Sequence, residues 1–132
     1  AAAEAASSAL WALLQPALVA LHRPGAPTAE ALEGALRDAF RATEQQLMEG
    51  VAESGTTAVC ALVLGGQLWV AHVGDSRCVL CHAERAVRLT EDHKPNVPAE
   101  EERIRAAGCE VTTPHARGIE NVPRINGQLS VS

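Results

Sequence analysis

The stretch "TTAVCALVLGGQLWVAHVGDSR" (residues 56–77) decides the fold class of this chain. Residues 56–64 are almost all β-branched or apolar, which is typical of a strand buried on both faces. Gly65-Gly66 is a two-residue hairpin signal, and residues 67–73 supply the returning strand. The run ends in Gly-Asp-Ser. The stretch therefore predicts a hairpin whose second strand leads Asp75 into a turn.

Two interpretations of Asp75 are open from the residues alone. Aspartate is common in tight turns because its carboxylate accepts hydrogen bonds from nearby backbone N–H groups. A carboxylate at the end of a strand can also bind a hard cation. Mg²⁺, however, takes several oxygen ligands, usually carboxylates from separate strands plus waters. One aspartate cannot make such a site, so the metal interpretation needs support from elsewhere in the sequence.

Helices are predicted on both sides of this hairpin. Residues 1–50 are predicted to be helical, as one helix over 2–22 that kinks or breaks near Pro16 and a second over 28–49. Thr28 is placed to cap the second helix, and the turn-forming composition of residues 23–27 separates the two. The apolar stripe expected along the second helix consists of Leu32, Leu36, Phe40, Thr43 and Leu47.

Further strands and one more helix are predicted after the hairpin. Two short strands, at residues 77–82 and 86–89, would complete an antiparallel meander over residues 54–89. A helix is predicted over residues 98–107, because proline suits a first helical turn and Gly108 ends the pattern. The last segment, residues 109–132, has weak patterning and is predicted to hold a surface flap and the start of another strand.

Composition narrows the function classes. The chain has 132 residues, of which 47% are apolar and 20% charged, so one globular domain with a real core is expected. The net charge of −5 and the scattered basic residues argue against binding to a nucleic-acid backbone. The apolar run at residues 9–21 is interrupted by Gln15 and Pro16 and is shorter than a spanning helix, so no membrane segment is expected.

The four cysteines are predicted to be free, buried or half-buried thiols. Cys78 and Cys81 form one C-x-x-C within an expected strand, where positions three apart face opposite sides. With Cys60 and Cys109 they make no second C-x-x-C, so a zinc set is not favoured. Free thiols and the lack of a signal peptide indicate an intracellular protein, in the cytoplasm or the nucleus.

The loop that contains Asp92, His93 and Lys94 is a second place where chemistry is conceivable. A general base needs an orienting partner and a nucleophile in reach, and the sequence identifies neither. The plainer interpretation is that Asp92 and Lys94 are solvated and that His93 packs or hydrogen-bonds locally. No G-x-S-x-G elbow and no glycine-rich phosphate loop is present in the sequence.

The order of these segments resembles the metal-dependent protein serine/threonine phosphatases of type 2C. "SGTTAVCALVLGGQLWVAHVGDSRCVL" (54–80) is similar to a family signature, although His72 stands where the family usually has asparagine. "LTEDHKPNVPAEEERIRAAGCEV" (89–111) is similar to the next family segment, with Cys109 where glycine is common. "RINGQLSVS" (124–132) resembles the family sequence that follows the flap. The resemblance covers nearly the whole chain.

This resemblance implies an α+β fold, as part of a four-layer α-β-β-α sandwich with two antiparallel sheets. It implies that residues 1–132 form a single, incomplete phosphatase-like domain. The complete domain would be a monomer that uses Mg²⁺ or Mn²⁺ to activate a water, which attacks the phosphorus of phosphoserine or phosphothreonine in phosphoprotein substrates. Among residues 1–132 it assigns one metal ligand, Asp75, at a third and more weakly held ion.

The family's other metal ligands belong to motifs that are expected before residue 1 and after residue 132. The 132-residue chain alone is therefore predicted to be inactive, and no catalytic residue is assigned within it. Two alternatives stay open. One is a pseudophosphatase or regulatory protein-binding module on the same fold, and the other is a small independent α+β binding domain.

Overall fold

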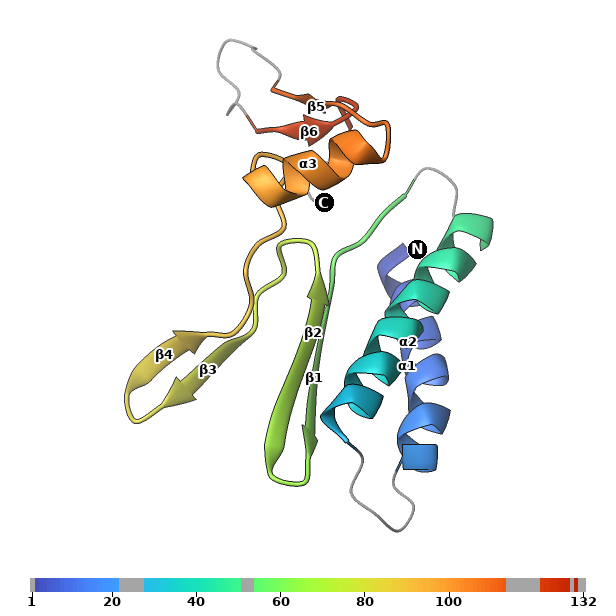
Figure 1. The fold of residues 1–132 in the computed structure, drawn as a ribbon, viewed down its shortest axis with the longest axis vertical. Coiled ribbons are helices and arrows are strands. Elements are labelled where there is room, and N and C mark those ends of the chain that lie inside the picture. Colours follow the sequence, from blue (N-terminus) through green and yellow to red (C-terminus); the bar gives the residue numbers. More distant parts are fainter. Residues whose placement is uncertain (1, 22–27, 51–53, 114–121, 129, 131–132) are drawn as a thin grey trace. The chain divides into compact units, whose positions relative to one another are not determined.

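The computed structural model describes residues 2–21, 28–50, 54–113, 122–128 and 130 (Figure 1). These residues form three helices and six strands, and the strands pair two by two as β1–β2, β3–β4 and β5–β6. The chain divides into two compact units, Ala1–Ala71 and His72–Ser132, which are described separately below. The turn predicted at residues 23–27, most of the flap and the end of the last predicted strand lie outside the described residues.

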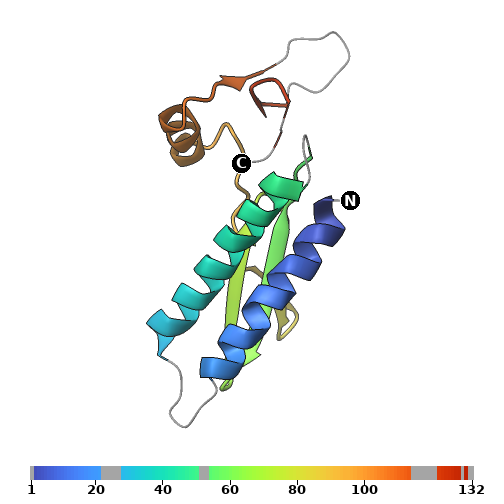
Figure 2. The same cartoon turned by 90° about the vertical axis from the view of Figure 1, so that its right-hand side faces the viewer.

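The first unit is a pair of helices packed on a hairpin. Helix α1 (Ala2–Leu21) and helix α2 (Ala29–Gly50) lie side by side, and both cover the same face of strands β1 (Ala58–Leu64) and β2 (Gln67–Val73) (Figure 2). The buried centre consists of Leu14, Leu36 and Ala39. Half-buried side chains around it come from both helices and both strands: Leu10, Leu13, Leu18, Cys60, Trp69 and Ala71.

Helix α1 passes through Pro16 without a break. The predicted break at Pro16 is therefore wrong. Packing of the helix offsets the loss of the one backbone hydrogen bond that proline cannot donate. This helix is long and apolar enough to cross a membrane by length and composition, as are the core helices of many soluble proteins. Leu14 of this helix packs against Leu36 of α2, and the absence of a membrane segment stays a prediction.

The start of α2 follows the predicted capping chemistry. The Ala31 N–H donates to Oγ1 of Thr28 at 3.2 Å, and the Leu32 N–H donates to the Thr28 carbonyl at 3.2 Å. The buried stripe differs from the predicted one at two members: Phe40 and Leu47 are only half-buried, and Ala39 is buried instead. The buried Thr43 hydroxyl has a hydrogen-bond partner within the helix, because it donates to the Ala39 carbonyl at 2.8 Å.

The hairpin β1–β2 turns where the sequence predicts. Gly65 and Gly66 have φ values of 59° and 77°, which suit the type I′ turn that joins antiparallel strands. Burial alternates along β1, so that one face meets the helices while Val59 and Val63 on the other face are exposed. The prediction that β1 is buried on both faces is therefore wrong. In the described part of the chain, only one face of β1 is covered.

The second unit contains strands β3 (Val79–His82), β4 (Arg85–Arg88), β5 (Val111–Thr112) and β6 (Arg124–Ile125), and helix α3 (Pro98–Ala106). Strands β3 and β4 pair antiparallel from Val79↔Arg88 to His82↔Arg85, and β5 pairs antiparallel with β6. Helix α3 begins at the predicted proline, and Gly108 follows its end with a φ of 78°. The continuous meander predicted over residues 54–89 takes the form of two separate hairpins in this structure.

The thiols follow the prediction in part. Cys60, Cys78 and Cys109 are half-buried and free, whereas Cys81 is free but exposed. Burial raises the pKa of the Cys60 thiol, which keeps it protonated and unreactive. Cys78 lies one residue before β3, so the C-x-x-C is not contained in a strand as expected.

The turn between β3 and β4 stores backbone strain that a substitution should relieve. Ala83 and Glu84 have φ values of 48° and 63°, a region that costs a non-glycine residue roughly 1 kcal/mol. We expect Glu84→Gly to raise the free energy of unfolding by about 1 kcal/mol, measured by urea denaturation. Glu84→Ala removes the same charge but keeps the Cβ, so an equal gain in that control would refute the backbone explanation.

Candidate functional site

The candidate site lies where the end of β2 and the segment after β4 meet within the second unit. Gly74 is buried, with a φ of 81°, and its carbonyl accepts a hydrogen bond from the His93 N–H at 3.0 Å. Positive φ is a conformation that glycine adopts without a steric cost, so Gly74 permits the sharp exit from β2. This backbone contact brings the Asp75 turn beside the loop that carries Asp92, His93 and Lys94.

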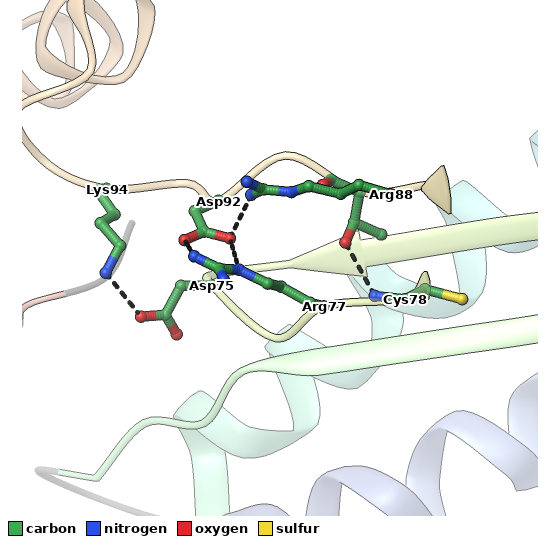
Figure 3. A network of polar contacts seen from close by, with 7 residues as sticks. Asp75, Arg77, Cys78, Arg88, Asp92 and Lys94 are labelled. Carbon is green, nitrogen blue, oxygen red and sulfur yellow. Dashed lines mark hydrogen bonds and ion pairs between the residues drawn. The ribbon is translucent and has the colours of Figure 1, made fainter. Parts of the chain in front are cut away.

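Asp75 faces Lys94 across this contact. Its Oδ2 atom accepts a hydrogen bond from Nζ of Lys94 at 3.3 Å, and the two side chains are 34% and 46% exposed (Figure 3). The structure thus brings together two of the four residues that the sequence singled out. Lys94 is not simply solvated, as the plainer interpretation of the loop had expected, because it is ion-paired.

Asp92 is held by two arginines that the sequence interpretation did not single out. Arg77 donates to it through Nε at 2.8 Å and through Nη2 at 2.7 Å, and Arg88 donates through Nη2 at 2.5 Å (Figure 3). A two-pronged guanidinium–carboxylate pair is a geometrically specific and strong contact. The expectation that Asp92 is solvated is therefore wrong, and this carboxylate has a structural partner on each side.

The arginines also dominate the ionisation of this cluster. The hydrogen bond from Arg77 is the largest cause that lowers the pKa of Asp92 from an ordinary value of 3.8 to about 2. Desolvation opposes it and is the next largest effect, and the charges of Arg77, Arg88 and Lys94 add to the lowering of the pKa. The same pair raises the pKa of Arg77. Asp92 is thus a carboxylate committed to its arginines, whereas the contact of Asp75 with Lys94 is longer, at 3.3 Å.

A pH titration should reveal this commitment. Because the folded pKa of Asp92 lies below the unfolded one, its contribution to stability is present above about pH 4 and is lost as the pH falls toward 2. We expect Asp92→Asn to flatten that part of the curve of melting temperature against pH, which differential scanning calorimetry from pH 2 to 6 measures. Identical slopes in both proteins would contradict the assignment.

Thr90 closes the β3–β4 hairpin at the site. Thr90 is only 2% exposed, and its Oγ1 accepts a hydrogen bond from the Cys78 N–H at 2.9 Å. The Thr90 carbonyl accepts from Nε of Arg88 at 2.5 Å. The ladder is completed by the Leu89 N–H, which donates to the Cys78 carbonyl at 2.9 Å. Thr90 therefore connects the hairpin to the arginine–aspartate cluster.

Removing the Thr90 hydroxyl should be costly. Thr90→Val keeps the shape but leaves the Cys78 N–H without its acceptor, which we expect to lower the free energy of unfolding by about 1–3 kcal/mol. Thr90→Ser keeps the acceptor and serves as the matched control. Urea denaturation measures both, and a valine variant as stable as the wild type would show that water replaces the hydroxyl.

His72 and His93 complete the cluster by stacking on each other. Their ring centroids lie 4.5 Å apart with an interplanar angle of 29°, which confirms the expectation that His93 packs locally. Burial, followed by the nearby His93, lowers the pKa of His72, so the neutral form is favoured in the folded chain. The two imidazoles thus pack against each other at the site.

The residues present fit a divalent cation only in part. Asp75 offers a partly exposed, hard carboxylate of the kind that Mg²⁺ and Mn²⁺ prefer. In the described ranges, however, no three His, Cys, Asp or Glu side chains converge into a metal-binding group. Asp92 is also unsuited, because both of its oxygens already accept from arginine. Asp75 can therefore serve as one ligand of a larger set, and not as a site by itself.

The fold and these segments match serine/threonine phosphatases of type 2C. The structure superposes on "serine-threonine phosphatase 2C from Toxoplasma gondii" with a TM-score of 0.69 and 26% identity, over 92% of this chain and 46% of that chain. The Protein phosphatase 2C family matches residues 6–132. The chain belongs to the protein phosphatase 2C family, which confirms the predicted resemblance and the predicted α+β fold class with antiparallel sheets.

Curated relatives agree with this assignment. "Probable protein phosphatase 2C 44" of Oryza sativa subsp. japonica is 42% identical over 102 residues, which are 74% of this chain and 30% of the relative. "Protein phosphatase 1F" of Homo sapiens is 41% identical over 117 residues, which are 86% of this chain and 24% of the relative. The chain thus spans about a quarter to a third of the length of these relatives.

The contact of Arg77 with Asp92 shows what sequence reasoning missed. Arg77 and Asp92 are 15 residues apart, and neither spacing nor local pattern pairs them. A usable signal was present, because Asp-Ser-Arg and Asp-His-Lys are two motifs of the same family resemblance, with charges that complement each other. Pairing those motifs would have predicted the Arg77–Asp92 and Asp75–Lys94 contacts, but not the contact of Arg88 with Asp92.

Proposed function

We propose that this chain is the central part of a protein serine/threonine phosphatase that removes phosphate from phosphoserine and phosphothreonine in protein substrates. The family match over residues 6–132 carries this proposal. The relatives named as protein phosphatases, at about 40% identity over most of the chain, support it.

We further propose that Mg²⁺ or Mn²⁺ is the cofactor and that Asp75 is one of its ligands. The carboxylate has hard oxygen donors, is partly exposed and lies on a turn fixed by Gly74. When bound, the ions would lower the pKa of an attacking water and neutralise phosphate charge. The remaining residues of the site hold its segments in place. Arg77 and Arg88 hold the loop that contains Asp92, and Thr90 holds the β3–β4 hairpin.

The 132-residue chain by itself should be inactive, because a single carboxylate cannot hold a cluster of hard cations. We also propose that residues 1–132 form one incomplete domain, that the complete domain is a monomer, and that the protein acts inside the cell. Four free thiols among the described residues support an intracellular location. Nucleic acid remains unexpected as a partner, given the net charge of −5. A membrane remains unexpected because Gln15 and Pro16 interrupt the apolar run at residues 9–21.

Phosphate release tests the proposal. The full-length gene product and the 132-residue chain would each be given a phosphothreonine peptide with Mg²⁺, with Mn²⁺, or with EDTA. We expect metal-dependent release from the full-length product and none from the 132-residue chain. A full-length product that folds but releases no phosphate with either ion would overturn the enzyme proposal and favour the regulatory binding module.

A further inference from the structure

Asp75 is opposite the only lysine in the sequence. Ten of the eleven basic residues are arginines, and the one lysine, Lys94, places Nζ 3.3 Å from Oδ2 of Asp75 (Figure 3). The composition otherwise uses arginine wherever a positive charge is needed. The choice of lysine at this position therefore needs a physical reason in the contact itself.

The backbone around Lys94 is built to hold it there. The preceding residue, His93, donates its N–H to the carbonyl of Gly74, the residue before Asp75, at 3.0 Å. The Lys94 carbonyl accepts from the Val97 N–H at 2.9 Å, and the following Pro95 is fully buried. These contacts fix the backbone at both ends of the ion pair. The freedom that remains is in the lysine side chain, which is 46% exposed.

The two carboxylates of the site provide a direct comparison. Asp92 accepts two hydrogen bonds from the planar fork of Arg77, at 2.8 and 2.7 Å, which closes it to other cations. Asp75 accepts one hydrogen bond at 3.3 Å from an ammonium group on a flexible stem. A lysine is a compact point charge that can swing away, whereas an arginine fork is held by both of its contacts. Asp75 is therefore compensated, yet still accessible.

We propose that Lys94 is a tethered counter-cation that occupies the Asp75 carboxylate when no divalent ion is bound and competes with that ion for it. This inference rests on the proposed function, because it takes Asp75 to be a metal ligand. A divalent ion that binds Asp75 must displace the ammonium group and then tolerate its positive charge nearby. Lys94 thus sets how weakly the ion is held, and keeps the turn free of an uncompensated carboxylate in its absence.

Isothermal titration calorimetry of the full-length gene product, which measures its affinity for Mn²⁺, tests this role. The Asp75-dependent binding step is defined by comparing the wild type with Asp75→Asn. We expect Lys94→Gln to tighten that step roughly two- to fivefold, the range expected for one partly exposed ion pair. Lys94→Arg keeps the charge and should bind no more tightly than the wild type. In the Asp75→Asn background, Lys94→Gln should change nothing.

Two controls separate competition from other effects. Arg85→Gln removes one positive charge from an exposed position of β4 in the same unit and should leave Mn²⁺ affinity unchanged. The gain from Lys94→Gln should also shrink as salt rises, because screening weakens the effect of the ammonium charge. A merely structural Lys94 would give the opposite direction, since a loosened loop would bind Mn²⁺ less tightly.

The outcomes distinguish failure of this inference from failure of the proposed function. If Asp75→Asn weakens Mn²⁺ binding but Lys94→Gln binds equally or less tightly than the wild type, the counter-cation role is refuted and the metal-ligand role stands. If the wild type binds no Mn²⁺, or Asp75→Asn binds it as well as the wild type, the metal role of Asp75 is refuted and the inference falls with it.

Discussion

Leu14→Ala is expected to lower the free energy of unfolding by about 2–5 kcal/mol, a large part of the stability of a small domain. Leu14 is 3% exposed and packs with Leu36 and Ala39 at the centre of the helix pair. Truncating it removes buried methyl groups and leaves a cavity, because the two helices and the hairpin can collapse only in part. Urea denaturation of the full-length gene product, followed by circular dichroism, measures the loss.

The same helix offers a matched control. Val19 is 66% exposed, so Val19→Ala removes methyl groups that the described residues do not cover. Alanine is also the better helix former, and the change should stay within about 0.5 kcal/mol of the wild type. Equal losses at both positions would contradict the burial pattern and show that both faces of α1 are covered in the full-length product. Equal losses near zero would refute the Leu14 core.

The helices were the most predictable part of this fold, because their signals are local. Thr28 lies within three residues of the N–H that it caps, and Pro98 and Gly108 delimit α3 by backbone preference alone. The apolar stripe of α2 was predicted in outline for the same reason. Its detail differed because α1 and the hairpin decide which side of the helix is buried, so that Ala39 replaced Phe40 in the core.

The strands were located well, but their turns and their coverage were predicted less well. Gly65 and Gly66 marked the first hairpin because glycine accepts positive φ. The second hairpin turns at Ala83 and Glu84, neither of which is a typical residue for that conformation, so no local signal identified it. The apolar composition of β1 predicts burial on both faces. Composition does not show whether the described chain also contains a second layer of helices or strands to cover the outer face.

The candidate site was predicted only as far as single residues allow. The residues alone left open whether Asp75 is a metal ligand or an ordinary turn aspartate. Only the family resemblance singled it out as a metal ligand. Its contact with Lys94 spans 19 residues of sequence, and the clamp of Arg77 on Asp92 spans 15. Such contacts depend on how the Gly74 backbone meets the His93 loop. The metal role of Asp75 stays a prediction.

Asp75→Asn is expected to raise the Mg²⁺ or Mn²⁺ concentration needed for half-maximal phosphate release by the full-length product at least tenfold, roughly the size of effect seen when a metal site loses one supporting group. The substitution keeps the size of the side chain and one oxygen, but it removes the negative charge that attracts the ion. It also leaves Lys94 without its counter-ion, which adds a positive charge beside the site.

The shape of the metal titration is the informative part of this experiment. If Asp75 is a ligand, activity should recover at high metal concentration, because the other ligands of the complete site remain. Asp38→Asn, a carboxylate change on α2 in the first unit, should leave the titration curve in place. A loss of activity that no metal concentration restores, with a normal melting temperature, would assign Asp75 a role other than ion binding. An unchanged curve would return it to an ordinary turn aspartate.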